Sequence, residues 1–292
     1  CCHLIKYDSI HGKFNADVKF DKNNLIINNK KIYYSRETDI NKINWKKNNV
    51  DIVLECTGKN NSKEKAIQHI INGAKKVIVS APCKNADKTI VYGVNHKIIN
   101  KKDLVISAAS CTTNCLAPIA KVLNDKFKIE KGFMTTIHSY TTDQRLLDNS
   151  HKDPRRARSA AQSIVPTSTG ASKALGEIIP ELKGKIEGLA FRVPTPNVSL
   201  VDLVFNSKKT LTVNKINEEF KKASKKNLKN ILDATEEKLV SIDFNHNPNL
   251  ATVDLSLTNV VGETMGKVSA WYDNEWGFAS KMSDLAEYIH KI

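Results

Sequence analysis

The sequence predicts an α/β protein made of two parts, a parallel-sheet unit followed by an α+β unit with a mainly antiparallel sheet. From 51 to 118, short β-branched runs alternate with helical stretches, whereas after about 130 longer strand-like runs follow one another with fewer helices between them. Alternation favours a parallel sheet, and consecutive strands favour an antiparallel one. The length of 292 residues is that of about two domains.

The first part is expected to contain three parallel strands and a connecting helix. The strands are expected at 51–55 (DIVLE), 76–80 (KVIVS) and 104–108 (LVISA). A helix is expected from about 62 to 72, where Asn61 followed by Glu64 predicts a capping box. Ligands of such sheets bind beyond the carboxyl ends of the strands. Those ends carry Thr57, Gly58, Ser80 and Ser110.

The second part is expected to be built from longer strands. They are expected at 131–140, 188–194, 198–205, 251–257 and 266–273. One helix is predicted where Ile216, Phe220 and Ala223 follow the spacing of a helix face. A last helix within 275–292 presents an apolar face and is expected to pack back on the first part. That face carries Phe278, Met282, Leu285 and Ile289.

Composition excludes several classes of protein. The 40% hydrophobic and 26% charged content is that of a folded chain, and no run approaches the roughly 18 apolar residues of a membrane helix. Six cysteines are too few for a secreted disulfide scaffold, so we expect a cytoplasmic protein without a membrane partner. The net charge of +14 comes from lysines scattered among asparagines. We interpret it as a solvated surface, with nucleic-acid binding as the alternative.

The densest chemical signal is ISAASCTTNCLAP at 106–118. A β run ends there and a helix is expected to begin at Cys111, where unpaired backbone N–H groups and the helix dipole favour a thiolate. Cys111 is therefore a candidate nucleophile, and Cys115, one turn on, is expected to pack in the core. The C-x-x-x-C spacing is not that of common metal or redox motifs, so we expect no metal site.

A thiol nucleophile needs a base, and His138 is the candidate. It lies at the end of an expected strand and is flanked by hydroxyls, Asp143 and Arg145. A lone histidine is more often structural, so only the pairing with Cys111 favours a catalytic role. Two further strings suit anions, namely PTSTG at 166–170 and the segment around Arg192. Each of these strings alone is equally consistent with a turn.

Taken together, these motifs closely resemble phosphorylating glyceraldehyde-3-phosphate dehydrogenases, over essentially all 292 residues. The strongest matches are SCTTNCLAP, HSYTTDQRLLD, PTSTGASKALGEIIPELKGK, FRVPTPNVSLVDL and WYDNEWGF, and KYDSIHGKF, ECTG and VYGVNH extend them. The resemblance implies an incomplete Rossmann-type NAD(P)-binding domain at 1–110 and a catalytic domain at 111–274. The family's N-terminal strand, G-x-G-x-x-G turn and following acidic residue do not occur in the sequence, so we expect a segment upstream.

The resemblance implies a glycolytic oxidation that passes through a cysteine thioester. Cys111 would attack the aldehyde of glyceraldehyde 3-phosphate, and His138 would act as the base. Inorganic phosphate would then release 1,3-bisphosphoglycerate. The resemblance assigns Thr141, Asp143 and Arg192 to the substrate's phosphate. It assigns Ser110, Thr169 and Gly170 to inorganic phosphate.

The cofactor implied by the resemblance is NAD, and the implied assembly is a homotetramer. Thr57, Gly58, Ser80 and Asn274 are assigned to the cofactor. Two departures bear on its identity. Phe278 stands where members usually carry Tyr, and Asn149-Ser150 stands where strictly NAD-using members tend to carry Leu-Pro. Small polar residues at the second place resemble members that also accept NADP.

Two alternatives remain open from the sequence. One is a relative acting on erythrose 4-phosphate, which would use the same thiol and base. The other is a basic nucleic-acid-binding protein on the same scaffold. Binding alone does not require Cys111, His138, two anion sites and Asn274 together, so the enzyme is the favoured interpretation.

Overall fold

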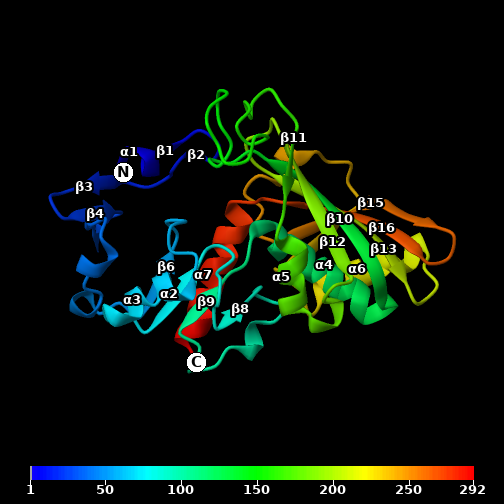
Figure 1. The fold of residues 1–292 in the computed structure, drawn as a ribbon, viewed down its shortest axis with the longest axis horizontal. Helices are drawn as coiled ribbons and strands as arrows, with labels where there is room; N and C mark the ends of the chain where they lie inside the picture. The colour runs from blue at the N-terminus through cyan, green and yellow to red at the C-terminus, as the bar shows by residue number, and fades with distance from the viewer. Residues whose placement is uncertain (1) are drawn as a thin grey trace.

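The computed structural model describes residues 2–292, so the first residue of the expected 1–110 domain lies outside the described residues. A parallel sheet of order β6-β7-β9-β8 and a larger mixed sheet of order β11-β12-β10-β13-β16-β15-β14 form two separate layers (Figure 1). The predicted α/β class is confirmed. Among residues 2–292, no helix combines the length and the apolar character needed to cross a membrane.

The N-terminal elements are small and form no part of either larger sheet (Figure 1). They are α1 (Cys2–Lys6), β1 (Tyr7–Asp8), β2 (Gly12–Lys13), β3 (Val18–Phe20), β4 (Asn24–Ile27) and β5 (Lys30–Tyr33). The strands β3, β4 and β5 form an antiparallel sheet of their own. This layer was not anticipated from the sequence.

The parallel sheet is covered on both faces because its strands are apolar on both. Its elements are β6 (Ile52–Glu55), β7 (Lys76–Val79), β8 (Lys88–Thr89) and β9 (Val105–Ser107), with α2 (Lys63–Ala66) and α3 (Gln68–Ile71). Val77 and Val79 pack with Ala66 on one face, and Ile78 packs with Leu285 of α7 (Trp276–His290) on the other. Figure 1 shows α7, in red, beside this sheet.

The helix expected at 62–72 is two short helices, α2 and α3, and the predicted capping box is wrong. Ser62 is the N-cap and makes no side-chain capping bond. The Asn61 amide instead donates to the Gly58 carbonyl (3.0 Å), and Glu64 accepts from the Asn85 amide (2.7 Å). A local bond to Gly58 and a long-range bond from Asn85 have replaced the reciprocal bonds of a capping box.

The larger sheet is mixed, with helices packed on one face. Its strands are β10 (Ile129–Ser139), β11 (Val165–Ser168), β12 (Ile186–Val193), β13 (Ser199–Ser207), β14 (Leu232–Thr235), β15 (Ala251–Val261) and β16 (Met265–Tyr272). The helices are α4 (Cys111–Phe127), α5 (Ala171–Ile178) and α6 (Val213–Lys225). Leu116 and Leu123 of α4 are buried against Met134 and Leu203 of the sheet.

The strand pairing of this sheet brings His138 and Arg192 together. β10 pairs antiparallel with β13 but parallel with β12, which is why the sheet is only mainly antiparallel. The β10–β12 register places His138 directly beside Arg192. Both strands end there, next to the start of α4, so two residues 54 positions apart meet at one edge of the sheet.

Candidate active site

Cys111 lies at the first residue of α4, as the sequence predicts. The turn from β9 into the helix passes through Ala109, a buried residue with φ +58°, a backbone conformation that non-glycine residues rarely adopt. The Ser110 hydroxyl then caps the helix by accepting from the Thr113 N–H (3.1 Å). The thiol is thereby held at the positive end of a 17-residue helix.

His138 faces the thiol from the end of β10. Its Nε2 lies 3.4 Å from Cys111 Sγ, and its Nδ1 lies 2.7 Å from the Ser139 carbonyl and 2.6 Å from Arg192 Nη1. Nδ1 cannot donate to the carbonyl and accept from the guanidinium at once. We assign the proton to Nδ1, because a carbonyl can only accept and Arg192 also reaches that carbonyl (3.0 Å). This tautomer leaves the Nε2 lone pair facing the thiol.

The electrostatics favour an uncharged thiol and imidazole when no substrate is present. Burial raises the pKa of the Cys111 thiol, against the opposing effects of Arg192 and backbone N–H groups. Burial and the Arg192 charge lower the pKa of His138 to about 4. The expectation that the helix start favours a thiolate is therefore wrong for this state, because loss of hydration outweighs the dipole. His138 is instead a neutral base poised to take the thiol proton.

Arg192 is a cation with unused hydrogen-bonding capacity beside these two groups. Its Nε is buried and has no partner within the described residues 2–292. Burial lowers the pKa of the guanidinium, while Cys111, Tyr272 and Asp143 oppose that effect. An orphaned guanidinium N–H beside a nucleophile is suited to an anionic substrate group, since such groups accept charge-assisted hydrogen bonds.

Thr141 and Asp143 follow in the loop after β10. The Thr141 N–H donates to Gln144 Oε1 (2.8 Å), and Asp143 forms ion pairs with Arg156 and with His151 (3.6 Å). The influence of Asp143 on the Arg192 pKa places this carboxylate within electrostatic range of the guanidinium. Thr141 has no hydrogen bond to Cys111, His138 or Arg192 within the part of the chain that the structure describes.

The three residues assigned to inorganic phosphate lie at two helix starts. Ser110 caps α4, and Gly170 is the N-cap of α5, where the Thr169 hydroxyl accepts from the Ala171 N–H (3.2 Å). A Cβ added at Gly170 would contact no atom within 4 Å, so the space above this helix start is open. In residues 2–292 no hydrogen bond connects Thr169 or Gly170 with the thiol.

The cofactor candidates lie at the carboxyl edge of the parallel sheet and at Asn274. Ser80 donates its N–H to the Glu55 carbonyl (3.0 Å), which joins the ends of β7 and β6. Gly58 has φ +71°, so the turn after β6 favours glycine. Asn274 Oδ1 accepts from two serine hydroxyls at 2.9 Å, so its amide N–H₂ group remains as the free donor.

This donor set fits a nicotinamide dinucleotide. A fixed amide donor suits the carboxamide, and the exposed edge at Thr57 and Gly58 suits the polar remainder of the molecule. The two serines that hold Asn274 are Ser139 and Ser199, and Ser139 also provides the carbonyl that orients His138. Cofactor contact and base orientation therefore share one residue.

Sequence reasoning missed Tyr272. Its hydroxyl bonds with the Thr112 and Thr136 hydroxyls at 2.9 Å each, and its ring lies edge-on to His138 with centroids 5.9 Å apart. Tyr272 thus ties the first turn of α4 to the strand that carries the base. The available signal was its place in WYDNEWGF, two residues before Asn274.

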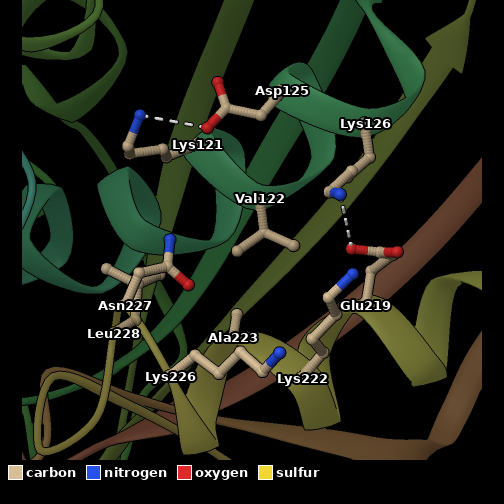
Figure 2. A pocket seen from close by; sticks show the side chains of 10 residues that line it. All are labelled: Lys121, Val122, Asp125, Lys126, Glu219, Lys222, Ala223, Lys226, Asn227 and Leu228. Atoms are coloured by element: carbon tan, nitrogen blue, oxygen red, sulfur yellow. Dashed lines mark hydrogen bonds and ion pairs between the residues drawn. The ribbon is translucent and has the colours of Figure 1, made fainter.

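Another cavity, between α4 and α6, lacks this chemistry (Figure 2). Its volume is about 140 Å³, and Figure 2 shows its lysines paired in part with acidic groups. Lys121 contacts Asp125 (3.0 Å) and Lys126 contacts Glu219 (3.2 Å). Lysines in the last turns of two helices complement the helix dipoles, so a stabilising role accounts for them.

Comparisons with known proteins agree with this geometry. Residues 110–274 match the model of the "Glyceraldehyde 3-phosphate dehydrogenase, C-terminal domain" family, and residues 1–63 match its "NAD binding domain". The chain belongs to this family. The glyceraldehyde-3-phosphate dehydrogenase 2 of Bacillus subtilis is 51% identical over 288 residues, which cover 98% of this chain and 85% of that protein. The resemblance noted from the motifs is confirmed.

Further relatives show the same extent of similarity. The glyceraldehyde-3-phosphate dehydrogenase of Geobacillus stearothermophilus is 54% identical over 98% of this chain and 86% of its own length. That of Xanthobacter flavus is 51% identical over 99% of this chain and 87% of its own length. The chain is thus an oxidoreductase of the glyceraldehyde-3-phosphate dehydrogenase family with NAD as cofactor. These findings do not favour a nucleic-acid-binding protein or an erythrose 4-phosphate dehydrogenase.

Proposed function

We propose that this glyceraldehyde-3-phosphate dehydrogenase converts glyceraldehyde 3-phosphate, inorganic phosphate and NAD into 1,3-bisphosphoglycerate and reduced NAD. The observation that carries the proposal is the placement of the Cys111 thiol 3.4 Å from the His138 base, with Arg192 beside both. A nucleophile, its base and an anion-binding cation are the parts that a phosphorylated aldehyde requires.

Cys111 and His138 carry out the covalent steps. His138 Nε2 takes the thiol proton as Sγ attacks the aldehyde carbon and passes it to the carbonyl oxygen, which gives a hemithioacetal on Cys111 and leaves His138 neutral again. When bound, NAD supplies the acceptor for the hydride that leaves this carbon. His138 takes the hydroxyl proton as the hemithioacetal becomes a thioester. Attack by phosphate on the thioester carbon then breaks the C–S bond and releases 1,3-bisphosphoglycerate, and the proton held by His138 returns to the Cys111 sulfur.

The remaining candidates orient the reactants. Arg192, Thr141 and Asp143 form the proposed site for the substrate's phosphate, in which the Arg192 guanidinium supplies the charge. Ser110, Thr169 and Gly170, at the starts of α4 and α5, form the proposed site for the attacking phosphate.

Asn274, Ser80, Thr57 and Gly58 form the proposed cofactor contacts. Asn274 would hold the carboxamide with the amide donor that Ser139 and Ser199 leave free. The placement of Thr57, Gly58 and Ser80 at the parallel sheet and of Cys111 and His138 at the larger sheet supports a cofactor domain at 1–110 and a catalytic domain at 111–274. The 275–292 helix packs against the cofactor domain. Use of NADP as well, suggested by Asn149-Ser150, remains a prediction.

The proposal includes a homotetramer in the cytoplasm. The face of the larger sheet opposite α4, α5 and α6 leaves Phe133 half exposed, and the loop after β10 exposes Leu146 and Leu147. Such apolar surfaces are typical of interfaces between subunits. Cys2, Cys56, Cys83, Cys111 and Cys115 are all free, which supports a reducing compartment.

Absorbance of reduced NAD tests the activity directly. We expect continued formation of reduced NAD only when glyceraldehyde 3-phosphate, NAD and inorganic phosphate are all present. Without phosphate, the reaction should stop after about one equivalent per site, since the thioester remains on Cys111. Continued turnover without phosphate would contradict the proposal, and so would equal turnover with erythrose 4-phosphate.

A further inference from the structure

A buried chain of hydrogen bonds lies behind the proposed cofactor edge and takes no part in the mechanism above. Trp45 Nε1 lies 3.0 Å from His69 Nδ1, and His69 Nε2 lies 2.9 Å from Glu55 Oε2. Glu55 is only 3% exposed and His69 only 5%. Glu55 is the last residue of β6, two positions before Thr57.

Trp45 determines which group donates and which accepts in this series of hydrogen bonds. An indole N–H can only donate, so His69 Nδ1 accepts, and the neutral ring therefore carries its hydrogen on Nε2. His69 then donates to Glu55, which remains the acceptor. Hydrogen bonds from Asn60, Thr57 and His69 hold the pKa of Glu55 at about 2 against the effect of burial.

The other contacts of Glu55 reach the cofactor edge itself. Oε1 accepts from both the backbone N–H and the hydroxyl of Thr57, and the N–H distance is 2.8 Å. Oε2 also accepts from the Asn60 amide (2.9 Å). The carboxylate therefore receives four hydrogen bonds, two of them from one exposed threonine.

These bonds determine what Thr57 can offer to a ligand. Its hydroxyl hydrogen is donated to Glu55, and the Lys59 N–H donates to its oxygen (3.2 Å). The capacity that remains on Thr57 Oγ1 is that of an acceptor. A ribose hydroxyl can donate to it, whereas a phosphate oxygen cannot.

We propose that Glu55, held by His69 and Trp45, is a positioning residue that fixes Thr57 as a hydrogen-bond acceptor for a ribose hydroxyl of NAD. This inference rests on the proposed assignment of Thr57 to the cofactor. It assigns a role in cofactor affinity to the buried Glu55 and His69 and to the half-buried Trp45. Loss of the carboxylate should weaken binding by freeing the Thr57 hydroxyl to rotate.

Calorimetric titration of NAD into the full chain tests the inference with a readout independent of turnover. Glu55→Gln should weaken NAD binding by about tenfold, the effect of about one lost hydrogen bond. Thr57→Val should weaken it similarly, and Thr57→Ser should restore it. The double variant Glu55→Gln, Thr57→Val should bind NAD no more weakly than the single variant with the larger loss, because both changes remove the same contact.

The matched control is Asp103→Asn. Asp103 is a buried carboxylate of the same domain that accepts from the Asn100 N–H (2.8 Å), just before the start of β9 at the opposite edge of the sheet. Its loss should lower thermal stability without changing NAD affinity. The rate of Cys111 alkylation should match the original chain in Glu55→Gln and in Asp103→Asn, whereas the KM for NAD should rise in Glu55→Gln and Thr57→Val and stay unchanged in Asp103→Asn.

Three results would overturn the inference. Unchanged NAD binding in Glu55→Gln would rule out the positioning role of Glu55 and leave the proposed function intact. Equal weakening of NAD binding in Asp103→Asn would mean that the loss in Glu55→Gln reflects lower stability of the domain. Additive losses in the double variant would mean that Glu55 does not act through Thr57. Failure of the original chain to bind NAD would instead contradict the cofactor assignment on which the inference rests.

Discussion

At the residue scale, the reactive centre depends on three side chains, one of which sets the charge states of the other two. Cys111, His138 and Arg192 come from a helix start and two parallel strands. The guanidinium opposes the burial effect on the thiol pKa and also disfavours a charged imidazole. One cation therefore favours the thiolate product of proton transfer and keeps the base free of a proton beforehand.

Arg192→Ala should weaken the use of glyceraldehyde 3-phosphate far more than that of unphosphorylated glyceraldehyde. A charge-assisted phosphate contact is worth about 1.5 to 3 kcal/mol, or roughly ten- to hundredfold in kcat/KM. Steady-state kinetics with both aldehydes measure the difference. Equal losses for the two aldehydes would place Arg192 in a structural role.

The same variant should shift the pH dependence of Cys111 alkylation. Without the cation the thiolate loses a stabilising charge, so the thiol pKa should rise, and His138 loses a repelling charge, so its pKa should rise from about 4. The alkylation rate should therefore reach its plateau at higher pH than in the original chain. Iodoacetamide labelling across pH, read by mass spectrometry, is the measurement, and an unchanged profile would contradict this account.

How far the sequence predicts the site depends on whether the interactions are local. Cys111 could be identified because a strand, a hydroxyl and a helix start follow one another within 106–118. The raised thiol pKa could not, because it depends on burial by distant strands. The same holds for Tyr272, whose partners Thr112 and Thr136 lie at least 136 positions away.

At the element scale, the strands were predicted closely and the short helices were not. The run DIVLE at 51–55 became β6 (Ile52–Glu55), which pairs with β7 and places Val53 in the core, while Leu54 stays 41% exposed. The 62–72 segment is divided at Ile67 into α2 and α3, and Asn61 and Glu64 bond with Gly58 and Asn85 rather than with each other. The β3–β5 layer was missed because its strands are three or four residues long and carry mixed polar residues.

Helix α7 offers a test at this scale. Leu285 is 2% exposed and packs with Ile78 and Ile106 of the parallel sheet. Leu285→Ala should cost about 2 to 5 kcal/mol in the free energy of unfolding, through lost burial and the cavity left behind. Chemical denaturation measures it, with the exposed Ile71→Ala as the control that should change little. Equal effects would show that α7 does not stabilise this layer.

At the scale of the whole molecule, the uncovered sheet face predicts assembly. Phe133 lies on β10 and remains 49% exposed. Phe133→Lys should shift the protein to a smaller species in analytical ultracentrifugation, because a charge at a buried interface is costly. The exposed Ile98→Lys should leave the distribution unchanged. A monomeric original chain at micromolar concentration would contradict the proposed tetramer.

The claim that connects all three scales is that Cys111 carries the acyl group of the substrate. Intact-protein mass spectrometry after mixing with glyceraldehyde 3-phosphate and NAD, with phosphate left out, tests it most directly. We predict one added phosphoglyceroyl group per chain, located at Cys111 by peptide mapping, lost on addition of phosphate, and absent in Cys111→Ser. An acyl group on another residue, or full activity in Cys111→Ser, would contradict the account.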